Sequence, residues 1–329
     1  MRSGPTALTA PKTPSRGRAL RPYVFLVLAN LFWAGNFVFA EGVVRELSPL
    51  QLTFYRWLLA APLLIGLALV IERPKWLLAL KHWKYQLGQS MLGVTGFTLF
   101  TYEALKLTSS VNAALTQAIN PPMIVLCAAL IFHTVPRKTT WLGLTISLLG
   151  VSIVLLGPQL SAGSFSAESI NGGVLLMLGA VVCWTLYSVL GRRNPSPPIT
   201  STAIQATFGV IVLLPVMAFT GFSVSLSAAG AAGLAYIVVF PAVLSLVLWN
   251  TAVRDVGPTR ASGFLNLLPI FTAALAVALG AELAWPQIIG GCLVIAGVFV
   301  TSRVPINRRE VGTQNGTDTG TKTGAKSGG

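Results

Sequence analysis

The chain of 329 residues has little charge and few of the side chains that carry catalysis or bind metals. Only 10% of its residues are charged, and its two histidines, His82 and His133, are not spaced as zinc ligands. Three cysteines, Cys127, Cys183 and Cys292, each lie inside an apolar run and are expected to be small buried residues. No glycine-rich nucleotide-binding motif is present. We therefore expect no metal site, no cofactor, no catalytic residues and no direct coupling to ATP hydrolysis.

Acidic residues are scarce as well. The chain has nine Asp and Glu and 23 Lys and Arg, which gives a formal net charge of +14. The basic residues are spread through short loops and tails, so no basic domain is available to lie along a nucleic acid duplex. Acidic residues avoid the middle of the apolar runs, and Glu41, Glu103 and Glu282 lie at their ends. A buried carboxylate is the usual mark of a proton relay inside a membrane, and none is expected here.

Long apolar runs make up most of the chain, which is 53% hydrophobic. The runs are continuous rather than alternating, and each is long enough to cross about 30 Å of hydrocarbon as a helix. The predicted fold class is therefore an all-α integral membrane protein with ten transmembrane helices. Their predicted ranges are 22–41, 50–71, 85–104, 111–132, 139–157, 171–191, 199–220, 230–252, 259–280 and 286–303.

The polar segments give the predicted orientation. Residues 1–21 and 304–329 are predicted to be disordered tails, and residues 158–170, between the fifth and sixth helices, form the longest linker. With the amino terminus inside, 20 of the 23 Lys and Arg fall on the inner side, two (Arg45 and Lys106) fall outside, and Arg56 lies within a helix. This positive-inside bias predicts that both termini are cytoplasmic.

The chain repeats itself. Four pairs of residues stand 147 positions apart, namely Pro122 with Pro269, Gly143 with Gly290, Gly150 with Gly297, and Tyr102 with Trp249; Trp33 and Trp184 stand 151 apart. We expect two copies of one five-helix unit, at residues 22–157 and 171–303. An odd number of helices inverts the second copy, and inverted repeats place a substrate site near the midplane where the halves meet. This architecture is typical of carriers.

These features resemble a known family over residues 22–303. The sequence Trp33-Ala-Gly-Asn36-Phe37, the paired prolines and glycines, and the stretch 256–269 are similar to the drug/metabolite transporter superfamily, and within it to EamA-domain exporters, including one for aromatic amino acids. The resemblance implies export of small metabolites across the inner membrane. The family often has Glu at the end of both the fourth and ninth helices; here Glu282 fits, but Val135 replaces the other.

Two faces rich in aromatic and polar groups are candidates for the substrate site. Trp33, Asn36 and Phe37 lie on one face of the first helix, and Trp184 and Tyr187 repeat that face in the sixth. We interpret them as a cavity wall that stacks on a ligand and orients it. The alternative is ordinary helix packing, with Asn36 as a hydrogen-bonding contact between helices.

A second candidate set surrounds the prolines. Gln117, Asn120 and Pro122 in the fourth helix are mirrored by Asn266 and Pro269 in the ninth. Proline frees a backbone carbonyl, which at membrane depth needs a partner or cavity water. Pro122 and Pro269 are predicted hinges, and the polar side chains are predicted ligand contacts; a static kink is the alternative.

Arg56 is the only basic residue clearly inside a predicted span. A charged side chain within the membrane is a candidate functional residue by default. It is interpreted either as a contact for a substrate carboxylate or as a structural residue that extends outward to Glu41 or Glu46. Gln205 occupies the equivalent position 149 residues later. The aromatic pair Tyr102 and Trp249 completes the predicted substrate-binding set.

Tryptophans and glycines near the span ends have structural interpretations. Trp57, Trp76, Trp83, Trp141 and Trp285 are predicted to anchor the helices at the membrane interface. The paired glycines, seven residues apart within each copy, are predicted to let neighbouring helices approach closely.

The function predicted from the sequence is an inner-membrane carrier that exports amino acids, aromatic ones first, by alternating access. Helices one, three, four, six, eight and nine would line its cavity, and transport would be uniport or weakly coupled. Phosphates are disfavoured because only Arg56 and Arg260 would approach the site. A multidrug exporter of cations is the alternative, and an integral-membrane enzyme is less favoured. The expected partners are a small-molecule substrate and the lipid bilayer, and both a monomer and a dimer are compatible with the sequence.

Overall fold

The computed structural model describes residues 16–131, 138–157, 171–191, 194–256 and 263–302, and within them all regular structure is helical. Six helices are long and apolar enough to cross a membrane: Leu20–Val43, Pro49–Ile71, Ser110–Ile131, Gly172–Gly191, Pro198–Thr220 and Ala228–Val253. Shorter apolar helices cover Trp141–Val154, Phe264–Ala278 and Trp285–Val300. The predicted all-α membrane fold is confirmed, while ten spans and the side on which the termini lie stay predictions.

The helices of the first half follow the predicted ranges. They are α1 (Arg16–Val43), α2 (Pro49–Ile71), α4 (Trp83–Gln89), η1 (Ser90–Gly96), α5 (Phe97–Leu107), α6 (Ser110–Gln117), α7 (Asn120–Ile131) and α8 (Lys138–Leu155). The apolar runs predicted these positions because a helix satisfies its own backbone groups inside a membrane. One short helix, α3 (Trp76–Leu80), lies in a segment that the sequence indicated only as a loop.

The helices of the second half follow their predicted ranges in the same way. They are α10 (Gly172–Gly191), α11 (Pro198–Thr220), α12 (Ala228–Ile237), η3 (Val238–Leu244), α13 (Ser245–Val256), η4 (Gly263–Asn266), α15 (Leu267–Ala278) and α16 (Trp285–Ser302).

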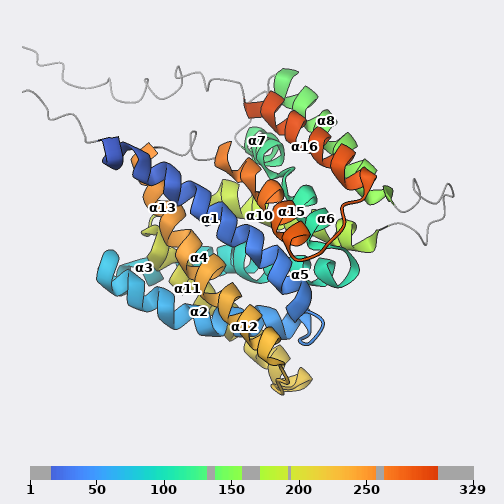
Figure 1. Ribbon diagram of the computed structural model, residues 1–329. Helices are drawn as coiled ribbons and strands as arrows, with labels where there is room; N and C mark the ends of the chain where they lie inside the picture. Colours follow the sequence, from blue (N-terminus) through green and yellow to red (C-terminus); the bar gives the residue numbers. More distant parts are fainter. Residues whose placement is uncertain (1–15, 132–137, 158–170, 192–193, 257–262, 303–329) are drawn as a thin grey trace, which may run out of the picture.

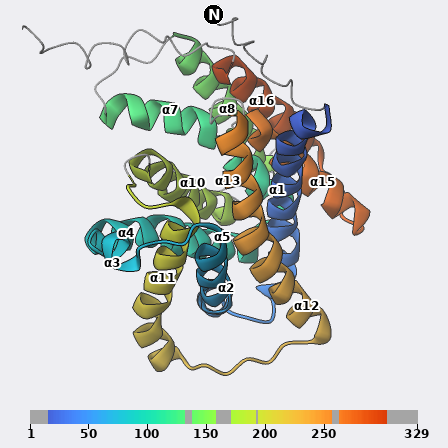
Figure 2. The same cartoon turned by 90° about the vertical axis from the view of Figure 1, so that its left-hand side faces the viewer.

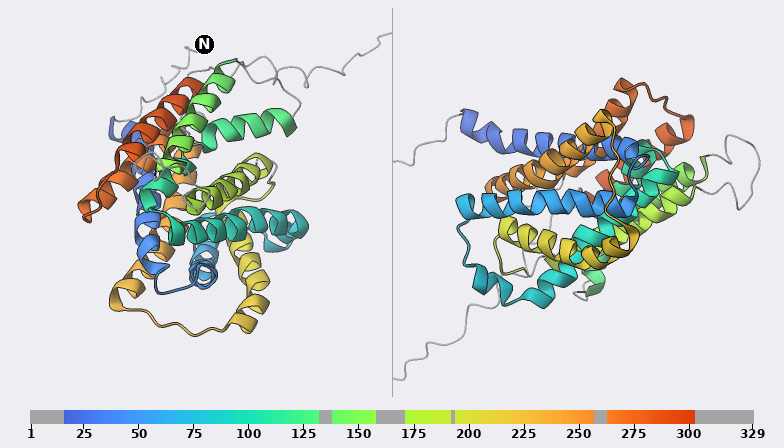
Figure 3. Two further views of the ribbon diagram at one scale, coloured as in Figure 1. Left: turned by 90° about the vertical axis from the view of Figure 1, so that its right-hand side faces the viewer. Right: turned by 90° about the horizontal axis from the view of Figure 1, so that it is seen from below.

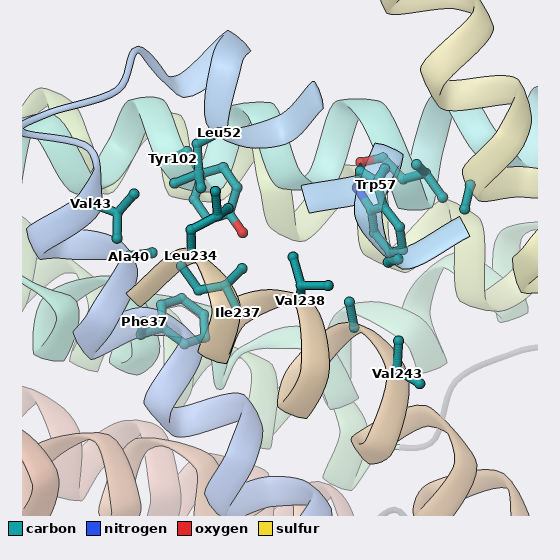
Figure 4. Packing of buried hydrophobic residues seen from close by; sticks show 14 of the residues in the cluster. Phe37, Ala40, Val43, Leu52, Trp57, Tyr102, Leu234, Ile237, Val238 and Val243 are labelled. Atoms are coloured by element: carbon teal, nitrogen blue, oxygen red, sulfur yellow. Dashed lines mark hydrogen bonds between the residues drawn. The ribbon is translucent and has the colours of Figure 1, made fainter. Parts of the chain in front are cut away.

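Figures 1 and 2 show α1 lying beside α12 and α13, which come from the far end of the chain. Figure 3 shows α2 beside α11, again one helix from each half. The main apolar core fills the space between these helices. In Figure 4, Phe37 and Val43 of α1 face Leu234 and Ile237 of α12, with Tyr102 of α5 close by. The two halves therefore share one core rather than folding around separate ones.

The pair formed by α8 and α16 depends on glycine (Figure 1). A Cβ atom on Gly150 would lie 2.5 Å from the carbonyl oxygen of Gly290, and one on Gly297 would lie 2.5 Å from that of Gly143. No side chain fits at these distances, so the small residues allow the two backbones to touch. The predicted role of the paired glycines is confirmed.

Two long helices contain π-helical segments at matching positions. The segment η1 begins at Ser90 and η3 begins at Val238, 148 positions later, and each is seven residues long. A π-helical turn widens the helix and redirects backbone carbonyls, and such segments occur often at functional sites. Gly93 and Val94 of η1 and Pro241 of η3 line the cavity described below.

Candidate functional site

A cavity of about 470 Å³ lies between the two halves. That volume suits a small molecule, since ligand sites span roughly 300–1,000 Å³. The residues predicted from the sequence that line it are Trp33, Asn36, Phe37, Arg56, Gln117, Asn120, Trp184, Tyr187, Trp249 and Asn266. Six helices were expected to line the cavity, and the structure adds two more: α2 contributes Arg56 and Trp57, and α11 contributes Pro198, Ser201 and Thr202.

Two pairs of aromatic rings form part of the wall. The rings of Trp33 and Trp249 lie 5.5 Å apart between centroids, and those of Phe97 and Trp184 lie 4.9 Å apart. The indole N–H of Trp33 donates to the carbonyl of Pro241 in η3 at 3.1 Å. Because this hydrogen bond holds the Trp33 ring, the ring presents a fixed face to the cavity, and tilted aromatic pairs of this kind provide a stacking surface.

Arg56 lies buried at the cavity with polar partners inside the bundle. Its side chain is 6% exposed, and one guanidinium nitrogen donates to Asn36 Oδ1 at 2.9 Å and to the hydroxyl of Tyr102. The Tyr102 hydroxyl is also within 3.3 Å of Asn36 Oδ1, and the guanidinium carbon lies 4.9 Å from the centre of a Trp57 ring. Tyr102 is fully buried and is not among the residues that line the cavity, and its hydroxyl contacts Arg56. Its predicted contact with a substrate stays a prediction.

The expectation that Arg56 extends outward to Glu41 or Glu46 is wrong. Glu41 accepts from the backbone N–H of Ser110 at 2.9 Å, and Glu46 accepts from the backbone and hydroxyl of Ser227, both at 2.7 Å. The Ser227 hydroxyl and backbone hold the pKa of the exposed Glu46 carboxyl below its usual range. Acceptors within α1 and α5 keep the arginine in the bundle.

Arg56 is the only charged side chain among the described residues that line the cavity. Its Nε is buried and has no hydrogen-bond partner. A buried positive charge without a counter-ion is unfavourable in a medium of low dielectric constant. The described lining of the cavity therefore carries one positive charge and no negative charge.

Three neutral side chains that line the cavity also carry unpaired polar atoms. Gln117 Oε1, Asn120 Nδ2 and Gln89 Oε1 are buried without a hydrogen-bond partner, while Asn120 Oδ1 accepts from Thr185 Oγ1 at 3.1 Å. Leaving a buried donor or acceptor unpaired costs about 1–3 kcal/mol. These three atoms are therefore the candidates for hydrogen bonds to a ligand in the cavity.

Helix geometry changes at both predicted hinges. In the fourth predicted helix, α6 ends at Gln117 and α7 begins at Asn120, so Pro122 sits in the first turn after the break. In the ninth, the 3₁₀ segment η4 ends at Asn266 and Pro269 sits in the first turn of α15. Gln117, Asn120 and Asn266, which flank these breaks, line the cavity. Bending at Pro122 and Pro269 during transport stays a prediction.

The second half repeats the arginine contact with neutral groups. The Tyr187 hydroxyl donates to Gln205 Oε1 at 3.3 Å, and these residues stand 151 and 149 positions after Asn36 and Arg56. Gln205 Nε2 donates in turn to Gln86 Oε1 at 2.9 Å. The cavity is thus built from related positions, but one half carries the charge.

Trp57 was predicted to anchor α2 at the interface, and this is wrong. It is 5% exposed and lines the cavity, because its indole N–H donates to the carbonyl of Val94 in η1 at 3.2 Å. Trp285, Trp141 and Trp83 are 75%, 50% and 48% exposed, as the interface prediction requires. Nothing in the sequence marks η1, so the partner of Trp57 could not be seen in advance.

The residues that line the cavity extend to one end of the helix bundle. Asn194 and Ser196, in the connection from α10 to α11, belong to its lining. At the opposite end, the Glu41 and Glu46 contacts are joined by a hydrogen bond from the Tyr55 hydroxyl to the Phe222 carbonyl at 2.7 Å. These contacts tie α1 to α6, and they tie α2 and the α1–α2 connection to the segment before α12.

Three further residues named in the sequence analysis are not among the described residues that line the cavity. Val135 and Arg260 lie outside the described residues. Glu282 is exposed beyond the end of α15 and does not line the cavity.

Comparisons with known proteins place these features in a family. Residues 20–156 and 171–303 each match the EamA-like transporter family. The chain is 32% identical to the uncharacterized transporter YyaM of Bacillus subtilis strain 168 over 290 residues, covering 87% of this chain and 94% of that one. It is 31% identical to an uncharacterized transporter of Archaeoglobus fulgidus, covering 86% and 97%, and 24% identical to the uncharacterized inner membrane transporter YedA of Escherichia coli K12, covering 87% and 92%.

A solved crystal structure has the same fold, with a TM-score of 0.56 at 20% sequence identity. The match covers 87% of this chain and 96% of that chain.

Proposed function

The chain belongs to the EamA-like transporter family, and from this premise we propose that it exports amino acids, aromatic ones first, from the cell. Its place as a multi-pass protein of the inner membrane follows from its relatives and from its apolar helices. The family and the relatives point to a transporter rather than an enzyme. The proposal concerns the substrate and the mechanism.

One observation carries the choice of substrate: Arg56 is a buried cation in a cavity with aromatic walls. We assign the substrate carboxylate to the guanidinium, since charge-assisted hydrogen bonds of this type are the strong ones. The apolar part of the substrate would stack on Trp33 and Trp249, and its ammonium group would donate to the unpaired Gln117 Oε1. An aromatic amino acid offers all three groups.

Export of cationic drugs is the second candidate, and the charge of the cavity disfavours it. A carboxylate at membrane depth would be needed to balance the charge of a cationic substrate, and the described residues that line the cavity include no carboxylate. The fixed charge of Arg56 would in addition repel a cation at close range.

We infer that transport proceeds by alternating access between two inverted repeats. Three observations support the repeat: the family matches the chain twice, η1 and η3 begin 148 positions apart, and the Arg56–Asn36 contact has its counterpart in Gln205–Tyr187. Rocking of the halves around the cavity, with bending at Pro122 and Pro269, would expose the site to each side in turn. The scarcity of acidic groups favours uniport or weak coupling.

The direct test is efflux of a radiolabelled aromatic amino acid from proteoliposomes that contain the purified protein. Arg56→Gln should lower the efflux rate at low substrate concentration roughly 10-fold or more, because a hydrogen bond to a charged group contributes about 1.5–3 kcal/mol. Lys138→Gln, which removes an exposed basic residue that does not line the cavity, should leave the rate unchanged.

Two further outcomes would contradict the proposal. Efflux of an organic cation that is retained or enhanced in Arg56→Gln, without amino acid efflux in the wild type, would favour the multidrug exporter. Uphill amino acid movement driven by an imposed pH gradient would contradict uniport.

A further inference from the structure

The connection between α2 and α4 exposes an apolar surface at the end of the helix bundle. It contains the short helix α3, whose Leu77 and Leu78 side chains are 89% and 62% exposed. Trp76 precedes them and Trp83 follows, and tryptophan is enriched where a membrane meets water. Such a surface would be unfavourable in water, and its flanking residues indicate that it lies at the level of the lipid headgroups.

Positive charges surround this surface. Arg73, Lys75, Lys81 and Lys84 are all exposed, and none forms an ion pair with an acidic side chain in the described part of the chain. The acidic residue of the connection, Glu72, is already engaged, because it accepts from the backbone of Ile199 at 3.0 Å and from the backbone and hydroxyl of Thr200, both at 2.7 Å. The four cations therefore lack an internal counter-ion.

A second cavity, of about 380 Å³, opens among these residues. Its lining combines Arg73, Lys75 and His82 with Leu78 and with the segment 195–197 that leads into α11. Glu72 also lines it, and the hydrogen bonds to Ile199 and Thr200 occupy both oxygens of its carboxylate. Arg73 has a left-handed backbone conformation (φ 47°), which is uncommon for a residue other than glycine and occurs often at functional sites. The conformation turns the chain sharply at the end of α2 and brings Arg73 and Lys75 to one cavity.

We propose that this cavity binds the headgroup of an anionic phospholipid. The phosphate would lie among Arg73, Lys75 and His82, and the acyl chains would cover Leu77 and Leu78. Clusters of lysine and arginine beside a membrane-spanning helix attract anionic lipids by about 1 kcal/mol for each cation. The exposed leucines favour a lipid over a free anion, since only a lipid brings apolar chains to the same place.

The proposed headgroup site lies between elements of the two halves of the chain. Its walls come from the end of α2 and from the segment before α11, which belong to different halves of the chain. Glu72 joins the same two elements through the first turn of α11. A bound headgroup would therefore strengthen a contact between the halves at the end of the bundle where the transport cavity is lined by Asn194 and Ser196.

The test is native mass spectrometry of the full-length protein in detergent, titrated with phosphatidylglycerol and, separately, with phosphatidylcholine of the same acyl chains. The wild type should bind phosphatidylglycerol at least 10-fold more tightly. In Arg73→Gln/Lys75→Gln this preference should fall about 10- to 30-fold, as expected from two cations at about 1 kcal/mol each. The control Arg21→Gln/Lys138→Gln removes two exposed basic residues outside the cavity and should keep the wild-type preference.

Each remaining outcome contradicts the proposal. Equal binding of the two lipids by the wild type would show that the cations do not recognise the headgroup. An equal loss in both double variants would show a nonspecific effect of net charge. Displacement of phosphatidylglycerol by inorganic phosphate at equal concentration would identify a site for a free anion instead. Because no transport is measured, the result does not depend on the proposed substrate.

Discussion

At the scale of single residues, the side chain that determines the character of the cavity is Arg56. Its position within an apolar run was visible in the sequence, but its partners were not. The structure provides Asn36 Oδ1 and the Tyr102 hydroxyl as acceptors, from helices 20 and 46 positions away. These acceptors lie within the bundle and hold the side chain there, while its buried Nε has no hydrogen-bond partner.

Tyr102 offers a test of how Arg56 is held. Tyr102→Phe removes the hydroxyl and keeps the ring, so packing in the core should change little. Without this acceptor the guanidinium is less well oriented, and we expect the KM for amino acid efflux to rise about 10-fold with little change in the maximal rate, since a hydrogen bond to a charged group contributes about 1.5–3 kcal/mol. Efflux kinetics over a range of substrate concentrations provide the measurement.

A double-mutant cycle separates this positioning role from a general structural effect. In an Arg56→Gln background, Tyr102→Phe should have little further effect on KM. An equally large additional rise in that background would mean that Tyr102 acts independently of the arginine.

At the scale of helices, the sequence predicted where helices lie but not how they deviate from regular geometry. Continuous apolar runs predict helices because no other element satisfies backbone groups inside a membrane. The prolines also indicated the breaks before Asn120 and Leu267. The π segments η1 and η3 were missed because their residues, such as Val94 and Leu244, are equally common in α-helices. Tertiary contacts, including those of the Trp33 and Trp57 indoles with their carbonyls, accompany that geometry.

Gly93 provides a test of η1. A Cβ atom at this position would lie 2.4 Å from Cδ2 of Tyr187, so Gly93→Ala should displace the ring from the cavity wall and from Gln205. We expect amino acid efflux to fall at least 10-fold while the protein still inserts. Gly88→Ala is the matched control, because its Cβ would have no neighbour within 4 Å. Efflux and thermal unfolding of both variants distinguish the two cases, and equal efflux in both would contradict a role for the π segment in shaping the site.

At the scale of the whole molecule, the repeat in the sequence predicted a site between two halves, and the cavity does lie there. Spacing within one helix was enough to select Trp33 and Asn36, because a helix face follows from its period. It was not enough to place α2 and α11 at the cavity, since this depends on which helices pack together. The polar residues Ser201 and Thr202 had no pattern that distinguished them from ordinary surface positions.

The contacts of Glu41, Glu46 and Tyr55 at one end of the bundle lead to the last prediction. Ser188 lines the cavity, whereas Ser223 is exposed at the opposite end, beside contacts that join α2 to the segment before α12. With Cys127, Cys183 and Cys292 replaced by serine, a Ser188→Cys variant should react with a membrane-impermeant maleimide only from the cytoplasmic side. A Ser223→Cys variant should react only from the other side.

The measurement is the rate of maleimide labelling of each variant in inverted and in right-side-out vesicles. A transported amino acid should slow labelling of Ser188→Cys, because it occupies the same cavity, but it should not affect Ser223→Cys. If Ser188→Cys reacted only from the periplasmic side, the predicted orientation of the chain would be wrong. If it reacted from both sides at similar rates, the halves would alternate readily without substrate, and the contacts of Glu41 and Glu46 would not hold one end of the cavity closed.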